Sequence, residues 1–101
     1  MIKHIVMWDV LGRSDQEKEG NIERVRTAFE DLRGKIPGMV HLEVGTDTSR
    51  ADHACDVVLY TEFDTQRSLD GYAAHPEHLR VRAELDGVRI RRHQVDYPVG
   101  E

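Results

Sequence analysis

The chain alternates between segments with a two-residue repeat of hydrophobic side chains and segments with a three-to-four-residue repeat. A two-residue repeat, or a short run of branched and aromatic residues, is typical of β-strands. Four segments have this character, and glycine, proline or polar residues bound them. They predict strands from Ile2 to Leu11, Met39 to Thr46, Cys55 to Phe63 and Val88 to Tyr97, with a loop from Asp47 to His53.

The first helical stretch follows the first strand. Ser14 can cap it in a capping box with Glu17, and Gly34 and the Pro37-Gly38 pair end it. Apolar residues at spacings of three and four predict one buried helix face. This face consists of Ile22, Val25, Phe29, Leu32 and Ile36.

The second helical stretch is interrupted. Asp64 or Thr65 can cap it, and Pro76 fits the first turn of a new helix better than the interior of an existing one. We therefore expect a break at His75 and a further helix that ends at Gly87. The expected apolar positions are Leu69, Tyr72 and Ala73 before the break and Leu79, Ala83 and Leu85 after it.

The predicted order of elements is β-α-β-β-α-β, the ferredoxin-like arrangement within the α+β class, in a single domain over residues 1–101. The helices of such a fold cover one face of an antiparallel sheet. The first strand is nevertheless apolar on both sides, with Val6 and Trp8 on one side and Ile5 and Met7 on the other. The sheet therefore needs a second cover.

A second copy of the same sheet is the economical cover, because homodimers are the commonest closed assemblies. We expect a homodimer in which Val6, Trp8 and Leu59 are buried between the two subunits. The alternative is a sheet whose second face stays partly exposed.

Composition narrows the class of protein. The 14 Lys and Arg residues against 19 Asp and Glu give a net charge of −5, which disfavours nucleic acid and anionic membranes as partners. The sequence has no apolar run of about twenty residues that could span a membrane, and its N-terminus lacks the pattern of a signal peptide. The single cysteine, Cys55, cannot form an internal disulfide, which suits a reducing cytoplasm. We expect a cytoplasmic protein.

Candidate chemistry gathers around the predicted break in the second helical stretch. Tyr72, His75 and His78 stand three residues apart, and His4 lies within an apolar strand. Histidine can take or give a proton near neutral pH, and a tyrosine hydroxyl can donate to a carbonyl that gains negative charge. Asp96, in the last strand, could orient a histidine as its carboxylate partner.

Each of these residues also has a purely structural interpretation. His4 can be a hydrogen-bonded core residue, His75 a helix cap, and Tyr72 part of the apolar core. Three arginines near the end of the chain are typical of a solvated strand or sheet edge: Arg89, Arg91 and Arg92.

Metal and cofactor chemistry find little support in the sequence. The histidines lack the i, i+4 spacing of zincins, and no cysteine cluster accompanies them, so we expect no metal. No glycine-rich phosphate loop is present, and we expect no cofactor. Cys55 has no neighbouring base that would activate a thiol.

Several segments together resemble the stress-responsive dimeric α/β-barrel (Dabb) family, in order and over nearly the whole chain. The most specific is Tyr72-x-x-His75-Pro76-x-His78. The others are Ile2-Lys3-His4-Ile5-Val6, Ile36-Pro37-Gly38, Glu43-Val44-Gly45, Asp56-Val57-Val58-Leu59 with Phe63, and Val95-Asp96-Tyr97. The resemblance implies a ferredoxin-like protomer that pairs with a second copy to form a dimeric α/β barrel.

The family includes a plant olivetolic acid cyclase that closes a polyketide thioester by aldol condensation without cofactor or metal. Similarity to that enzyme implies His78 as the base, Asp96 as the carboxylate that orients it, and Tyr72 as the group that binds the carbonyl. Phe29 and Val57 stand where the enzyme has a pocket tyrosine and a pocket histidine, so two hydrogen-bonding groups are missing. The implied pocket residues are His4, Val6, Trp8, Phe29, Val57, Leu59 and His75.

The resulting expectation is a homodimer with a small-molecule pocket inside the barrel. If the protein is an enzyme, it performs cofactor-free proton transfer on a carbonyl or polyketide-like compound, as in cyclisation or isomerisation. The alternatives are a non-enzymatic, stress-responsive protein that binds a small apolar or aromatic carbonyl ligand, and a purely structural role for the polar residues.

Overall fold

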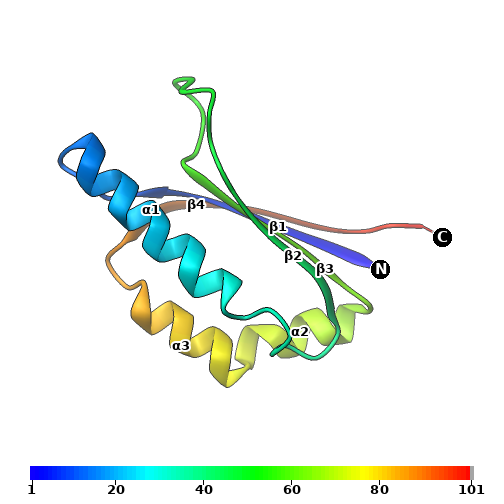
Figure 1. The fold of residues 1–101 in the computed structure, drawn as a ribbon. Coiled ribbons are helices and arrows are strands. Elements are labelled where there is room, and N and C mark those ends of the chain that lie inside the picture. Colours follow the sequence, from blue (N-terminus) through cyan, green and yellow to red (C-terminus); the bar gives the residue numbers. More distant parts are fainter. Residues whose placement is uncertain (101) are drawn as a thin grey trace.

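In the computed structural model, which describes residues 1–100, four antiparallel strands form one sheet and three helices lie against one of its faces (Figure 1). The strand order β2-β3-β1-β4 confirms the predicted ferredoxin-like arrangement. The elements are β1 (Ile2–Val10), α1 (Asp15–Glu30), β2 (Met39–Thr46), β3 (Val57–Phe63), α2 (Gln66–Ala74), α3 (Pro76–Glu84) and β4 (Arg89–Pro98).

Side chains cap the helices close to the predicted positions. The Ser14 hydroxyl accepts the backbone N–H of Glu17 at 3.1 Å, and Thr65, rather than Asp64, accepts that of Ser68 at 3.1 Å. At the predicted break, His75 has the extended conformation that a following proline favours. Its Nδ1 accepts the Glu77 N–H at 3.1 Å, which confirms His75 as the cap of α3.

Helix α1 is shorter than predicted. It ends at Glu30, because the backbone of the next residues changes to i→i−3 hydrogen bonds, from Leu32 to Phe29 and from Arg33 to Glu30. Leu32 and Ile36 remain buried although they lie beyond the helix. The apolar repeat therefore identified buried residues correctly and placed the helix end too late.

The helices cover the face of the sheet that was expected to be free of helices. Val6, Trp8 and Leu59 are at most 5% exposed within one chain, where the helices cover them. The expectation that these residues lie between two subunits is therefore wrong. Both sides of the central strands are apolar, so the alternation itself does not show which side meets the helices.

The face of the sheet opposite the helices, which we call the free face, carries the side chains that alternate along the strands with those under the helices. The strand register places these side chains next to one another, because Ile5 pairs with Tyr60 and with Val95, and Met7 pairs with Val58. Several are exposed in the single chain, Val95 to 50% and Met7 to 36%. The apolar and aromatic residues of the free face are Ile5, Met7, Val58, Tyr60, Val95 and Tyr97, and Lys3, Glu62 and His93 lie on the same face.

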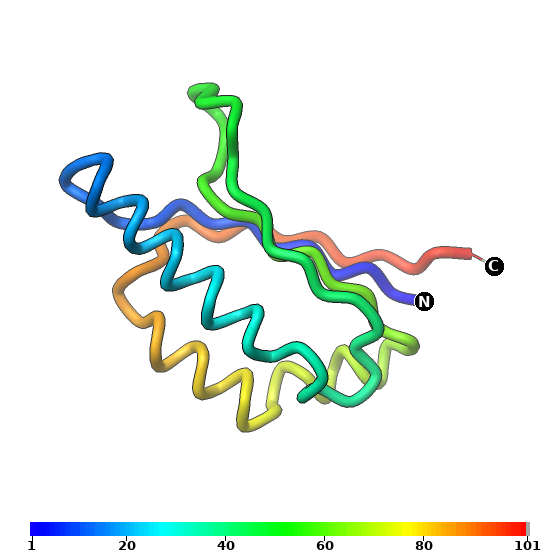
Figure 2. The backbone as a smooth tube through the Cα atoms, viewed as in Figure 1, coloured from blue at the N-terminus to red at the C-terminus, as the bar shows by residue number. Residues whose placement is uncertain are grey.

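Strand β4 is an edge strand that pairs only with β1, and the two run side by side to the end of the sheet where both termini lie (Figure 2). Its register places His4 opposite Asp96 and Trp8 opposite Arg92. A shift in register between Trp8 and Asp9 then leaves Arg91 as the extra residue of a bulge. Among residues 1–100, no helix is long and apolar enough to cross a membrane.

Candidate functional site

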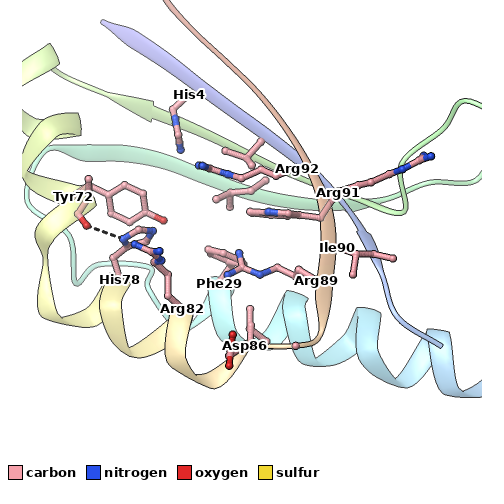
Figure 3. A pocket seen from close by; sticks show the side chains of 16 residues that line it. His4, Phe29, Tyr72, His78, Arg82, Asp86, Arg89, Ile90, Arg91 and Arg92 are labelled. Atoms are coloured by element: carbon pink, nitrogen blue, oxygen red, sulfur yellow. Dashed lines mark hydrogen bonds between the residues drawn. The ribbon is translucent and has the colours of Figure 1, made fainter.

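A cavity of about 450 Å³ opens between the helices and the β1–β4 side of the sheet (Figure 3). This volume is within the usual range of small-molecule sites. The cavity lies on the helix side of the sheet and not on the free face, where a second sheet would pack. Its apolar lining includes Val6, Trp8, Phe29, Leu59 and Leu85, and its polar lining includes His4, Tyr72, His78, Arg82, Arg89 and Arg92.

Tyr72, from α2, is a buried residue of the polar lining. Its ring lies 4.3 Å from the His78 ring and 6.1 Å from the His4 ring, measured between centroids. Within residues 1–100 its hydroxyl is buried without any hydrogen-bond partner. Burial raises the pKa of this phenol, so the hydroxyl keeps its proton. It can therefore donate a hydrogen bond to a ligand oxygen.

His78, from α3, lies beside Tyr72 (Figure 3). Its Nδ1 is 3.1 Å from the Ala73 carbonyl oxygen. A carbonyl only accepts hydrogen bonds, so Nδ1 carries the proton and Nε2 keeps a free lone pair. Burial, reinforced by the charge of Arg82, lowers the pKa of His78. The ring is therefore neutral near pH 7 and can accept a proton.

Asp96 pairs with His4 and not with His78. The Asp96 carboxylate accepts from His4 Nδ1 at 2.6 Å, and the Gln94 amide donates to its second oxygen at 3.0 Å. The cause is the strand register, which places His4 and Asp96 directly opposite each other on β1 and β4. The expectation that Asp96 orients His78 is therefore wrong.

This arrangement makes a prediction for Asp96→Asn. We expect the substitution to change the resonances of the His4 ring and to leave the titration of His78 in place, below the ordinary value of about 6.5. Because folding depresses this pKa, the contribution of His78 to stability is present above pH 6.5 and decreases as the pH falls below that value.

NMR titration of the histidines measures both effects, with His78→Ala assigning the resonance. A His78 titration that moves by a full pH unit in Asp96→Asn would contradict the pairing described here.

The remaining site candidates lie outside the cavity lining. Val57 is 2% exposed and belongs to the core, and His75 is held by its capping role. Asp96 reaches the cavity only through His4. For Cys55, burial and the nearby Asp9 carboxylate raise the pKa of the thiol, which disfavours a nucleophilic thiolate.

Arginines of the lining are the functional candidates that sequence reasoning missed. Arg89 and Arg92, which were expected on a solvated strand or edge, line the cavity together with Arg82. A signal was present, since the last predicted strand carries the polar run Arg91-Arg92-His93-Gln94 instead of the alternation typical of a half-buried strand. Among residues 1–100, no group of three or more His, Cys, Asp and Glu residues is arranged to hold a metal ion.

The fold and the site together define a ferredoxin-like α+β protein with a small-molecule-sized cavity under its helices, lined by tyrosine, histidine and arginine. The chain belongs to the stress responsive A/B barrel domain (Dabb) family, whose family model matches residues 2–99. A comparison with curated proteins finds no match.

Solved structures with the same fold come from bacteria and plants. A dimeric ferredoxin-like protein of unknown function from Bacteroides fragilis is 30% identical, with 97% of this chain and 95% of that chain covered and a TM-score of 0.85. A Dabb family protein from Mesorhizobium loti is 24% identical, with 98% and 97% covered and a TM-score of 0.77. Hydroxynitrile lyase from Passiflora edulis is 19% identical, with 99% and 94% covered and a TM-score of 0.79.

Proposed function

We propose that the protein is a homodimer whose cavities bind a small carbonyl compound and move a proton next to its carbonyl group without a cofactor. The observation that carries this proposal is the buried Tyr72 hydroxyl without a partner in the described part of the chain. An unsatisfied buried polar group costs about 1–3 kcal/mol. A ligand oxygen that accepts from Tyr72 would remove this cost.

The two imidazoles beside Tyr72 have different roles in this proposal. His78 is neutral and oriented by the Ala73 carbonyl, so its Nε2 is the base that takes the proton from carbon. Tyr72 donates to the carbonyl oxygen as negative charge develops on it. His4, fixed at Nδ1 by Asp96, turns its other nitrogen toward the cavity and positions the ligand (Figure 3).

Proton transfer next to a carbonyl is the step that cyclisation, isomerisation and related reactions share. We include in this proposal a relationship to polyketide cyclases such as olivetolic acid cyclase. Phe29 lines the cavity with an apolar ring at a position where that cyclase has a tyrosine. We therefore propose a substrate that makes fewer hydrogen bonds than a polyketide chain.

The homodimer is supported by the apolar free face and by the relative from Bacteroides fragilis, which is described as dimeric. Pairs such as Ile5 with Tyr60 and Met7 with Val58 place apolar side chains in the middle of a face that no helix of the described chain covers. Two such surfaces can bury one another about a twofold axis.

The proposed chemistry can be tested by hydrogen–deuterium exchange at the carbon next to a ketone. We expect the wild-type protein to accelerate this exchange, in D2O and followed by NMR, in phenylacetone or in 3-benzoylpropionate. His78→Ala should remove the base and lower the rate about a hundredfold, and Tyr72→Phe should lower it by a similar factor because the oxyanion loses its donor.

Matched controls separate these effects from a general loss of structure. His53→Ala removes an exposed loop histidine outside the cavity lining, so this variant should keep the wild-type rate. Circular dichroism of His78→Ala and Tyr72→Phe then shows whether each remains folded. Ligand binding without any acceleration of exchange would contradict the enzymatic proposal and leave a ligand-binding protein as the function.

A further inference from the structure

The cavity has a charge opposite to that of the chain as a whole. The protein carries a net charge of −5, yet the lining contains Arg82, Arg89, Arg91 and Arg92 and only one carboxylate, that of the exposed Asp86. A concave surface lined with one sign of charge concentrates ligands of the other sign. This contrast points to an anionic ligand.

Arg89 is the arginine placed most deeply in this surface. Its guanidinium carbon lies 4.7 Å from the centre of the Trp8 ring and 5.4 Å from that of Phe29. The two rings stack on each other, with centroids 5.2 Å apart and planes 16° from parallel. Within residues 1–100, no carboxylate lies within 4 Å of Arg89.

The β-bulge of β4 distinguishes Arg91, which also lines the cavity but already has a carboxylate partner, from Arg89 and Arg92. Arg91, the extra residue of the bulge, has a positive φ of 49° and donates to Asp9 at 3.3 Å. Arg89 and Arg92 on either side line the cavity without an ion-pair partner in the described chain. A bulge that redirects one side chain in this way is a common device next to binding sites.

A partly buried guanidinium without a counter-charge has lost water, and its contacts with the Trp8 and Phe29 rings offset only part of that loss. Burial and the charge of Arg92 accordingly lower the pKa of Arg89. The planar guanidinium fork matches a carboxylate with two parallel hydrogen bonds, and the aromatic surface beneath it excludes water, which strengthens such a pair.

We propose that the ligand of this cavity carries a carboxylate, which Arg89 binds, and an apolar or aromatic body that lies along Val6 and Leu59. With the carboxylate at Arg89, a carbonyl elsewhere in the ligand can reach Tyr72, so the ligand class is a keto acid or a related carbonyl acid. This inference rests on the proposed function for the location of the ligand, but binding alone tests it.

The experiment compares carboxylates with their neutral amides. Phenylacetate, 3-phenylpropionate and 3-benzoylpropionate are titrated against the corresponding amides, with the fluorescence of Trp8, the only tryptophan of the chain and part of the lining, as the readout. We expect at least one carboxylate to bind about ten- to a hundredfold more tightly than its amide.

Variants then assign this preference to one side chain. Arg89→Met should abolish it, and Arg89→Lys, which keeps the charge without the fork, should leave an intermediate preference. Arg67→Met is the matched control, because it removes an exposed arginine of α2 that lies outside the cavity lining, and it should bind like the wild type. Circular dichroism confirms that each variant is folded.

Two results would overturn the inference: no carboxylate of the three binds more tightly than its amide, or the preference persists in Arg89→Met. A preference that depends on Arg89, in a protein that fails to accelerate exchange, would uphold the carboxylate site and reject the proposed catalysis. Accelerated exchange without any preference for carboxylates would uphold the proposed catalysis and reject the carboxylate site.

Discussion

Phe29→Ala should lower the free energy of unfolding by about 3–5 kcal/mol, the usual cost of removing a large aromatic side chain from a packed core. Phe29 is only 1% exposed and is the point where α1 packs on the sheet, through its stacking with Trp8. It also forms part of the cavity lining. The vacated volume would join the cavity, so surrounding side chains can only partly close it.

Urea denaturation at a fixed protein concentration measures this loss, since the stability of a dimer depends on concentration. Phe29→Leu, which retains much of the volume, should cost clearly less, and Val40→Ala, at a residue 55% exposed, should change stability by less than about 0.5 kcal/mol. A Phe29→Ala protein as stable as the wild type would show that the contact between α1 and the sheet does not depend on this ring.

Val58→Asp should convert the proposed homodimer into monomers. Val58 lies in the centre of the free face, opposite Met7 on β1, and an aspartate there would be buried without a partner once the two faces meet. Truncating or unpairing one interfacial charge typically costs about 2–5 kcal/mol, and twofold symmetry introduces the change twice. The dissociation constant should therefore rise by about a thousandfold or more.

Sedimentation velocity over a range of concentrations measures this change. Leu79→Asp serves as the control, because Leu79 is 47% exposed on α3 and lies away from the free face, and it should sediment like the wild type. If the wild-type protein is a monomer at micromolar concentration, or if Leu79→Asp dissociates and Val58→Asp does not, the free face is not the interface.

The sequence was sufficient to predict the order of the elements and the break at His75, because these depend on local chemistry. A cap, a proline and an apolar repeat act over a few residues, so their effect on the backbone does not depend on contacts between distant segments. The proximity of Tyr72 to His78 was predictable for the same reason, since six residues across one helix break cannot separate far.

The pairing of Asp96 with His4 was not predictable, because it depends on the register between the first and last strands. That register is fixed by contacts between segments 92 residues apart and by a bulge that the composition of β4 does not reveal.

Which face of the sheet the helices cover was ambiguous for a different reason. Both sides of β1 are apolar, so either could have met the helices, and only the packing of the whole chain decides between them.

Strand β4 contributes charged side chains to the site and, within the described chain, none of the buried core residues. Arg89, Arg92 and Asp96 all lie on this edge strand, which is exposed along nearly its whole length, whereas the core beneath the helices comes from other elements. Substitutions at exposed positions usually change stability by less than about 0.5 kcal/mol. The charge and hydrogen-bonding character of the cavity can therefore change during evolution, one residue of β4 at a time, while the buried scaffold keeps its sequence.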